Sequence, residues 1–276
     1  MTRARGRKKR RVSGGSGSLW IGAAALGLLV LAASGAFGYF VWQAYANRIT
    51  LNQNLCRPEG PGSQTIVLVD ATDALHPLTQ TEILTLLEDV ADGVPTNGLL
   101  ELRTLEPGEQ RSEVLFALCN PGTGEELSEI TAAPALARKR WVDSFNAPLE
   151  AAMAQVVSAS QADSSPIMAA LQQIAVERLT SARDRATPSR IIVISDMLEH
   201  TPDFSIYQSG PDFAAFEQSR SARANATNLS AAEVEIWYLH RETRFSSVDV
   251  VQFWTQWVSE SGGVFKHAIP MQGLQP

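Results

Sequence analysis

An uncharged run from Leu19 to about Trp42 constrains the fold of this chain more than any other feature. At 1.5 Å of rise per residue, a helix over this run is long enough to cross a hydrocarbon core of roughly 30 Å. Aromatic residues flank the run, as is typical of side chains at the two membrane interfaces. They are Trp20 at one end and Tyr39, Phe40, Trp42 and Tyr45 at the other. The run therefore predicts one transmembrane helix, over residues 19–45.

The preceding residues, 1–18, predict the orientation of that helix. They hold seven Lys and Arg and no Asp or Glu, and residues 13–18 are only Ser and Gly. Such a tail has no core to bury and is expected to be disordered. Positively charged flanks stay in the cytoplasm. We therefore expect a single-pass protein of the inner (cytoplasmic) membrane with a periplasmic or extracellular domain.

A cleaved signal peptide is the alternative, because Ala44, Tyr45 and Ala46 have the small-x-small form of a cleavage site. The length of the run favours an uncleaved anchor, since the apolar core of a signal peptide has about 7 to 15 residues. Residues 46–63 then form a linker. Residues 64–276 are enough for one domain with a full core, and too few for two of comfortable size.

The charge of the exported part argues against nucleic acid as a partner. The chain has 23 Lys and Arg and 29 Asp and Glu. Seven of the basic residues lie in the tail, so the remainder has 16 basic against 29 acidic residues and a net charge near −13. The only two cysteines, Cys56 and Cys119, lie in this part, where thiols can oxidise. We expect a disulfide between them, with two buried free thiols as the alternative.

Strands are expected where β-branched and apolar residues run together, and helices where apolar residues recur every three or four positions. The expected strands are 65–70, 99–105, 114–119, 190–196, 234–239 and 263–267. The expected helices are 79–90, 134–157, 167–182 and 248–259, the third of them opened by a capping serine and by Pro166 in its first turn. Residues 106–113 are too few for a parallel crossover, so the strands 99–105 and 114–119 that they join should form a hairpin. The pattern predicts an α/β fold with a doubly wound, mostly parallel six-stranded sheet and one reversed strand.

Polar residues converge at the carboxyl ends of these strands, where binding sites of open α/β sheets form. Asp70, Thr72 and Asp73 follow the first strand, and Asp196 ends the fourth. Ser165 begins a helix that must start at the same edge. Hard oxygen ligands of this kind suit Mg²⁺, with Mn²⁺ or Ca²⁺ as alternatives. Without a metal, each aspartate would cap a following turn or helix by accepting backbone N–H bonds.

From Gln64 to His267 the sequence resembles the von Willebrand factor type A (vWA) domain family. The family's metal-ion-dependent adhesion site (MIDAS) has an Asp-x-Ser-x-Ser loop, a Thr in a second loop and an Asp after the fourth strand. Asp70 and Thr72 match the first two loop positions, Ser165 the Thr and Asp196 the last Asp. Ala74 departs from the pattern, because the family has a ligating Ser there, and Asp73 beside it is the candidate replacement.

The resemblance implies a membrane-tethered, non-enzymatic domain that binds another protein, with a carboxylate of the partner completing the coordination of Mg²⁺. A metal-independent scaffold that uses the insertion 201–229 and the acidic surface is the first alternative. A hydrolase is the second, because three histidines follow strand ends near Glu199. They are His76, His200 and His240.

The family's strand order also bears on the disulfide. It makes 114–119 the reversed strand, so Cys119 lies at the end of the sheet opposite the predicted metal site. Cys56 precedes the first strand, which starts at that same end. The resemblance thus implies that the two sulfurs meet. The bridge would hold the linker at that end of the sheet, and the predicted metal site would then point away from the bilayer.

Overall fold

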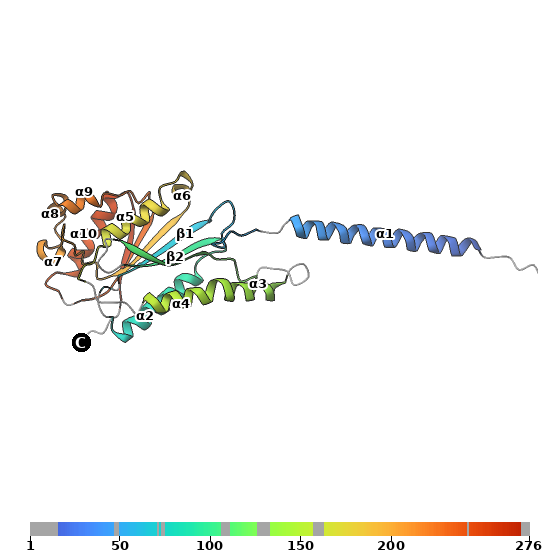
Figure 1. The fold of residues 1–276 in the computed structure, drawn as a ribbon, viewed down its shortest axis with the longest axis horizontal. Helices are drawn as coiled ribbons and strands as arrows, with labels where there is room; N and C mark the ends of the chain where they lie inside the picture. The colour runs from blue at the N-terminus through green and yellow to red at the C-terminus, as the bar shows by residue number, and fades with distance from the viewer. Residues whose placement is uncertain are drawn as a thin grey trace, which may run out of the picture. The chain divides into compact units, whose positions relative to one another are not determined.

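The computed structural model describes residues 16–46, 50–70, 72, 75–105, 111–125, 133–156, 163–241 and 243–271. The contacts divide the chain into two units, Met1–Thr50 and Leu51–Pro276. The first unit contains helix α1 (Ser16–Ala46), and the second contains all the strands and the remaining helices (Figure 1).

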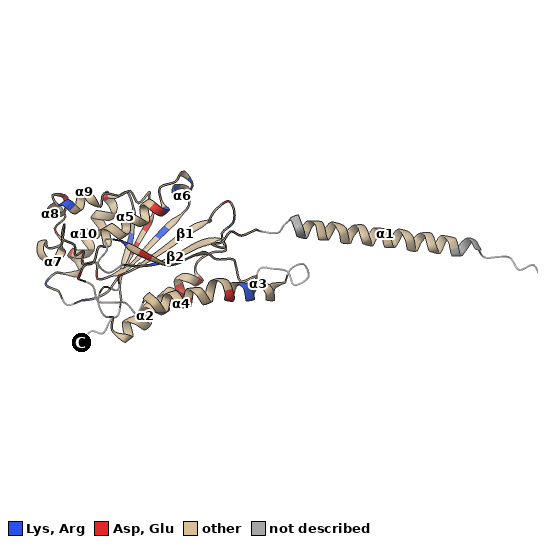
Figure 2. Ribbon diagram, in the orientation of Figure 1, with Lys and Arg blue, Asp and Glu red and all other residues tan. Residues whose placement is uncertain are grey.

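Helix α1 is the one described helix that is long and apolar enough to cross a membrane. Its apolar part runs from Trp20 to Gln43, 24 residues, or about 36 Å of helix. Figure 2 shows no acidic or basic residue along its described length. Its large apolar side chains, Leu29 and Phe37 among them, are exposed. Such a helix fits a single-pass membrane protein.

The second unit is built on the predicted six-stranded sheet. Its strands are β1 (Ser63–Val69), β2 (Gly98–Leu105), β3 (Ser112–Cys119), β4 (Ser189–Ser195), β5 (Glu233–Tyr238) and β6 (Val264–Pro270). They lie in the order β3-β2-β1-β4-β5-β6. Neighbouring strands are parallel except β2 and β3, which form the predicted hairpin. The fold class predicted from the sequence is therefore confirmed.

Alternating side chains of the inner strands build a core on each face of the sheet. Ile66 and Leu68 of β1 face α5 (Ile167–Arg178) and α10 (Ser247–Glu260). Val67 and Val69 face the opposite layer. That layer holds α2 (Pro77–Asp92) and a continuous helical segment made of α3 (Pro134–Trp141), a π-helical turn η1 (Val142–Asn146) and α4 (Ala147–Val156), which Figure 1 shows beside α2.

The helix predicted over 134–157 is present, with a local change in its winding. Phe145, Leu149 and Met153 are buried against the sheet, and Trp141 packs at the edge of the same core. Through η1 the amide of Ala147 bonds to the carbonyl of Val142, five residues back. One wider turn of this kind is a π-bulge, which shifts the register of the buried face.

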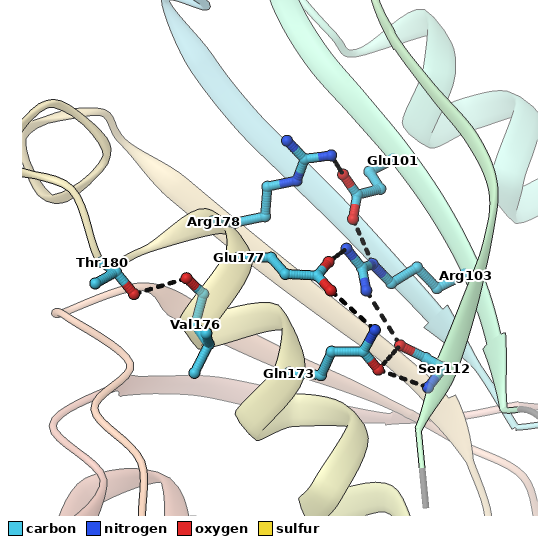
Figure 3. A network of polar contacts seen from close by, with 8 residues as sticks. All are labelled: Glu101, Arg103, Ser112, Gln173, Val176, Glu177, Arg178 and Thr180. Carbon is cyan, nitrogen blue, oxygen red and sulfur yellow. Dashed lines mark hydrogen bonds and ion pairs between the residues drawn. The ribbon is translucent and has the colours of Figure 1, made fainter. Parts of the chain in front are cut away.

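A buried polar network fastens β2 to α5 (Figure 3). The Arg103 guanidinium contacts the carboxylates of Glu101 and Glu177, and its Nη1 lies 3.2 Å from Ser112 Oγ. Arg178 pairs with the second oxygen of Glu101 at 2.5 Å. The side chains of Glu101 and Arg103 are fully buried. Buried charges persist only when paired and hydrogen-bonded, so the network substitutes for apolar packing at this edge of the sheet.

A disulfide closes the end of the sheet at which the parallel strands begin. Cys56 and Cys119 are bonded, with their Cα atoms 4.9 Å apart, which confirms the predicted bridge. Cys119 pairs with Leu99 at the start of β2, so it lies at the end of the sheet opposite Asp70, which follows β1. The Cys119 amide also donates to the carbonyl of Asn54. These contacts join the segment from Leu51 onward to the domain, although the sequence predicted a linker up to residue 63.

The insertion between β4 and β5 folds into three short helices. These are α7 (Ile206–Ser209), α8 (Phe213–Glu217) and α9 (Arg220–Ala224), and a further short helix, α6 (Ala182–Ala186), precedes β4. In the insertion, the ring of Phe204 stacks on Phe253 of α10, and the ring of Phe216 meets Phe253 edge to face. The insertion therefore belongs to the core on the α5 side instead of forming a separate lobe.

Candidate functional site

The candidate site lies at the carboxyl ends of β1 and β4, the two central strands. Val69 pairs with Ile194, and the Asp70 amide donates to the Ile194 carbonyl at 2.9 Å. The chain leaves β1 toward β2 on one side, while β4 and β5 extend on the other. This is the switch point at which open α/β sheets place their sites. We call the side chains gathered here the rim: Asp70, Thr72, Ser165, Ser195, Asp196 and Arg241.

Asp70 is the centre of the rim and is almost completely buried. Its Oδ1 accepts from the Thr72 amide at 3.2 Å and from the Thr72 hydroxyl at 2.7 Å. Its Oδ2 accepts from the hydroxyls of Ser165, at 2.7 Å, and Ser195, at 2.8 Å. These donors fill about four acceptor positions, the capacity of a carboxylate. Asp70 therefore ties together β1, β4 and the loop before α5.

Ser165 reaches Asp70 because its segment pairs with the chain that follows β4. Its backbone forms an antiparallel bridge with His200, with N···O distances of 2.9 and 3.0 Å. The sequence predicted a serine cap for α5, and this is wrong. Pro166 is the N-cap residue and makes no side-chain cap bond. The Ser165 hydroxyl donates a hydrogen bond to Asp70 instead, and the carboxyl group of Glu199 accepts one from the Met168 amide at 3.0 Å.

Glu199 is a fully buried carboxyl group behind the rim. Burial raises its pKa to about 8, and the nearby Asp70 charge adds to the rise. Hydrogen bonds from the amides of Met168 and Ile167 act in the opposite direction but are outweighed. Its Oε1 has no hydrogen-bond partner among the described residues. At neutral pH this side chain is therefore a neutral acid, because desolvation disfavours the charged form.

Asp196 sits on a strained turn that points its carboxylate toward β5. Met197 has φ of +59°, a left-handed conformation that costs a non-glycine residue roughly 1–2 kcal/mol. The turn is held by Ser195 Oγ, which accepts from the Met197 amide at 2.8 Å, and by Trp254 Nε1, which donates to the Met197 carbonyl at 2.7 Å. Asp196 Oδ1 accepts from the Leu198 amide at 3.0 Å.

The second oxygen of Asp196 contacts a cation supplied by the chain itself. Arg241, three residues beyond β5, places its Nε 2.6 Å from Asp196 Oδ2. The Asp196 side chain is 8 % exposed and that of Arg241 is 31 % exposed, so water only partly screens the pair. The guanidinium is always charged. The rim thus contains two carboxylates and one fixed positive charge.

A polar cleft of about 430 Å³ opens beside these residues. It is lined by Thr72, Asp163, Ser164, Ser165, Asp196, Leu198, His200, Tyr207 and Gln208. A larger cleft, of about 590 Å³, lies between α8 and α10 and has Asp212, Glu217 and Asp249 in its wall. Size alone would favour the second cleft. Only the smaller cleft is lined by residues that the resemblance to the vWA family singled out, namely Thr72, Ser165 and Asp196.

The three histidines of the hydrolase hypothesis have separate roles. His76 caps α2 by accepting from the Leu78 amide at 3.3 Å. His200 Nδ1 lies 2.9 Å from Ser205 Oγ, and its ring meets Tyr207 edge to face. His240 is exposed after β5. In the described part of the chain, no three His, Cys, Asp or Glu side chains are grouped so that they could hold a metal ion.

The predicted magnesium ligands come together, but as a set they fit the ion poorly. The hydroxyls of Thr72 and Ser165 donate hydrogen bonds to Asp70, which leaves their oxygen lone pairs for a cation. Asp70, however, is saturated with hydrogen bonds, and Asp196 is paired with Arg241. Mg²⁺ in proteins usually takes one or two carboxylates, and neither carboxylate is available without breaking existing contacts. Asp73 and Ala74 lie outside the described residues.

Two members of the rim were not anticipated from the sequence, Ser195 and Arg241. Ser195 is the last residue of β4, and a serine at a strand end carries no particular signal. Arg241 is separated from Asp196 by 45 positions, and its role depends on β4 and β5 being neighbours. Only the positions of Asp196 and Arg241 at the ends of two adjacent strands could have suggested that these two residues pair.

Comparison with known proteins concerns the fold alone. No family model matches the sequence, and no protein of curated function does so either. The solved VWA domain of SpRpn10 has 10% identity and a TM-score of 0.39, with 76% of this chain and 87% of that chain covered. An aerotolerance-related membrane protein from Bacteroides fragilis has 14% identity and a TM-score of 0.39, with 77% and 92% covered. The N-terminal domain of TFIIH p34 has 14% identity and a TM-score of 0.32, with 75% of this chain and 90% of that chain covered.

The fold is vWA-like. At these scores the likeness carries no argument about function, and the description rests on the strand order and on the single reversed strand β3. The vWA-like domain follows a helix long enough to anchor it in a membrane.

Proposed function

We propose that this chain is a membrane-tethered, non-enzymatic protein-interaction domain that binds a partner protein at the rim. One observation carries the proposal. The cleft beside Asp196 lies at the switch point of the sheet and is lined by polar side chains from three separate segments of the chain. In a vWA-like fold this is the location at which the family resemblance implies partner binding.

The position of the disulfide supports this use of the rim. Cys56 and Cys119 hold the segment that follows the anchor at the opposite end of the sheet from Asp70. The rim is therefore at the end of the domain away from the point where the chain enters it. We further propose that the domain is exported and the basic tail cytoplasmic, as the positive charge of residues 1–18 favours.

A second candidate function uses the other cleft. The space between α8 and α10 has three acidic residues in its wall, Asp212, Glu217 and Asp249, and the exported part of the chain is acidic overall. This arrangement favours a scaffold that binds a basic partner through the insertion, with no role for the rim.

Site-specific photo-crosslinking in cells separates the two functions. A photoreactive residue at Gln208, which is exposed in the rim cleft, is expected to give a discrete adduct with one partner protein. The same residue at Val176, exposed on α5 outside both clefts, is the matched control and should give none. An adduct from Glu217 but not from Gln208 would favour the scaffold, and no adduct from either position would remove the support for both functions.

A further inference from the structure

The rim already holds a positive charge where the family resemblance implies a metal ion. Arg241 Nε approaches Asp196 Oδ2 at 2.6 Å, slightly shorter than the roughly 2.7–2.9 Å typical of charge-assisted hydrogen bonds. Asp196 is held in place by the strained turn at Met197 and by the Leu198 amide. The contact therefore joins a positioned carboxylate to a guanidinium that does not lose its charge.

We propose that Arg241 takes the place of the divalent cation, so that the charge of Asp196 is balanced and the rim acts without a metal. The inference uses the proposed location of the binding rim, but it does not depend on whether a partner binds there. It concerns the charge balance of this chain's own residues.

Two features of the rim carry the proposal. First, Asp70 has hydrogen bonds from Thr72, Ser165 and Ser195, so it acts as a structural centre with no acceptor position left for a metal. Second, a metal that used Asp196 would have to displace Arg241 or lie a few ångström from its guanidinium. Like charges at that distance repel strongly in a partly buried site. The ion would be left with the two neutral hydroxyls of Thr72 and Ser165.

The loss of the second loop ligand agrees with this balance. Ala74 stands where the vWA pattern has a serine that ligates the metal. This chain thus has alanine at one ligand position of the pattern and an arginine paired with the aspartate at another, so protein groups alone surround the rim. If the proposed function is correct, partner binding at the rim should resist EDTA and weaken as the salt concentration rises, because the charges at the edge of the cleft are partly screened by ions.

Mn²⁺ titration of the full chain in detergent, followed by electron paramagnetic resonance, tests the proposal without a partner. Wild type is expected to show no saturable Mn²⁺ binding at millimolar metal. The Arg241→Ala variant removes the guanidinium from Asp196 and should bind one Mn²⁺ at least about tenfold more tightly than wild type. The added Asp196→Asn change should abolish that binding. Arg138→Ala is the matched control, because it removes an exposed arginine from an exposed ion pair with Glu125.

Three outcomes would overturn the proposal. One is saturable binding of a single Mn²⁺ to wild type that is lost in Thr72→Ala or Ser165→Ala. Another is the absence of Mn²⁺ binding in both wild type and Arg241→Ala, which would mean that Arg241 is not what excludes the metal. The last is equal binding in Arg241→Ala and Arg138→Ala. If Arg241→Ala does not fold, Arg241→Gln removes the charge while keeping a long polar side chain, and the same three outcomes decide.

Discussion

At the scale of single residues, Glu199 has an environment very different from that of an exposed side chain. It is fully buried beneath the rim, and it serves α5 as an acceptor for the Met168 amide. Serine or aspartate usually caps a helix start from within the same segment. Here the acceptor comes from 31 positions away, so the start of α5 and the end of β4 are held together by one carboxyl group.

The raised pKa of Glu199 predicts that its contribution to stability depends on pH. The folded pKa is about 8 and the reference value is 4.5. Between these values the native state holds a proton that the unfolded state releases, so the free energy of unfolding falls as pH rises. The contribution is fully present below pH 4.5 and is lost as pH rises through about 8. Glu199→Gln removes this dependence.

Urea unfolding of wild type and Glu199→Gln at several pH values checks the prediction. The stability of wild type relative to the variant should fall by about 1.4 kcal/mol per pH unit within this window. Glu233→Gln, which changes an exposed glutamate, is the control, and its free energy of unfolding should depend on pH as that of wild type does. A constant difference between wild type and Glu199→Gln across the window would show that Glu199 is charged in the fold.

At the scale of elements, the contact between β2 and α5 depends on buried charges. Arg103→Met removes the guanidinium shared by Glu101 and Glu177 and leaves Glu101 buried with only part of its neutralising charge. We expect a loss of about 3–5 kcal/mol in the free energy of unfolding. Denaturant unfolding followed by tryptophan fluorescence provides the measurement.

The controls for this prediction are in the chain itself. Arg138→Met removes the same charge from an exposed pair and should change stability by no more than about 0.5 kcal/mol. The double variant Glu101→Leu/Arg103→Met should recover much of the loss, because apolar side chains of similar volume often replace a buried ion pair without cost. A double variant as unstable as Arg103→Met would contradict the electrostatic explanation.

The disulfide is the second device at this scale. Its cysteines are 63 positions apart, and on the loop-entropy model such a bridge stabilises a domain by roughly 4 kcal/mol, less any strain. Cys56→Ala/Cys119→Ala should therefore unfold at lower urea concentration than oxidised wild type. Reduced wild type should behave like the variant. Equal midpoints with and without reductant, after thiol titration has verified reduction, would contradict the prediction.

For the whole molecule, the prediction concerns the two sides of the membrane. The basic tail should be cytoplasmic and the vWA-like domain exported, because positively charged flanks are retained. Single cysteines introduced at Gly14 and at Gly273 can be labelled in intact cells with a membrane-impermeant reagent. We expect labelling only at Gly273. Labelling only at Gly14 would reverse the orientation, and absence of residues 1–46 from the purified chain would identify α1 as a cleaved signal.

The sequence by itself determined the elements of this protein and their class. Runs such as 191–194, with four consecutive β-branched residues, belong in strands that are buried on both faces, and these alternate with helical patterns. The short connection at 106–113 requires a hairpin. The α/β class and the reversed strand of the hairpin follow from these local properties, because the apolar period and the loop length are written in neighbouring residues. The disulfide was expected on other grounds, namely two cysteines in an exported domain and the strand order that the resemblance to the vWA family implies.

Only the tertiary structure decided what the rim contains. The sequence identified Asp70, Thr72, Ser165 and Asp196 as neighbours, but not the arginine that pairs with the last of them. Arg241 reaches Asp196 because β5 lies beside β4, and Glu199 reaches α5 because its segment pairs with that of Ser165. Such contacts join positions tens of residues apart. Their distances depend on strand order and on single turns such as that at Met197, and no local period in the sequence records either.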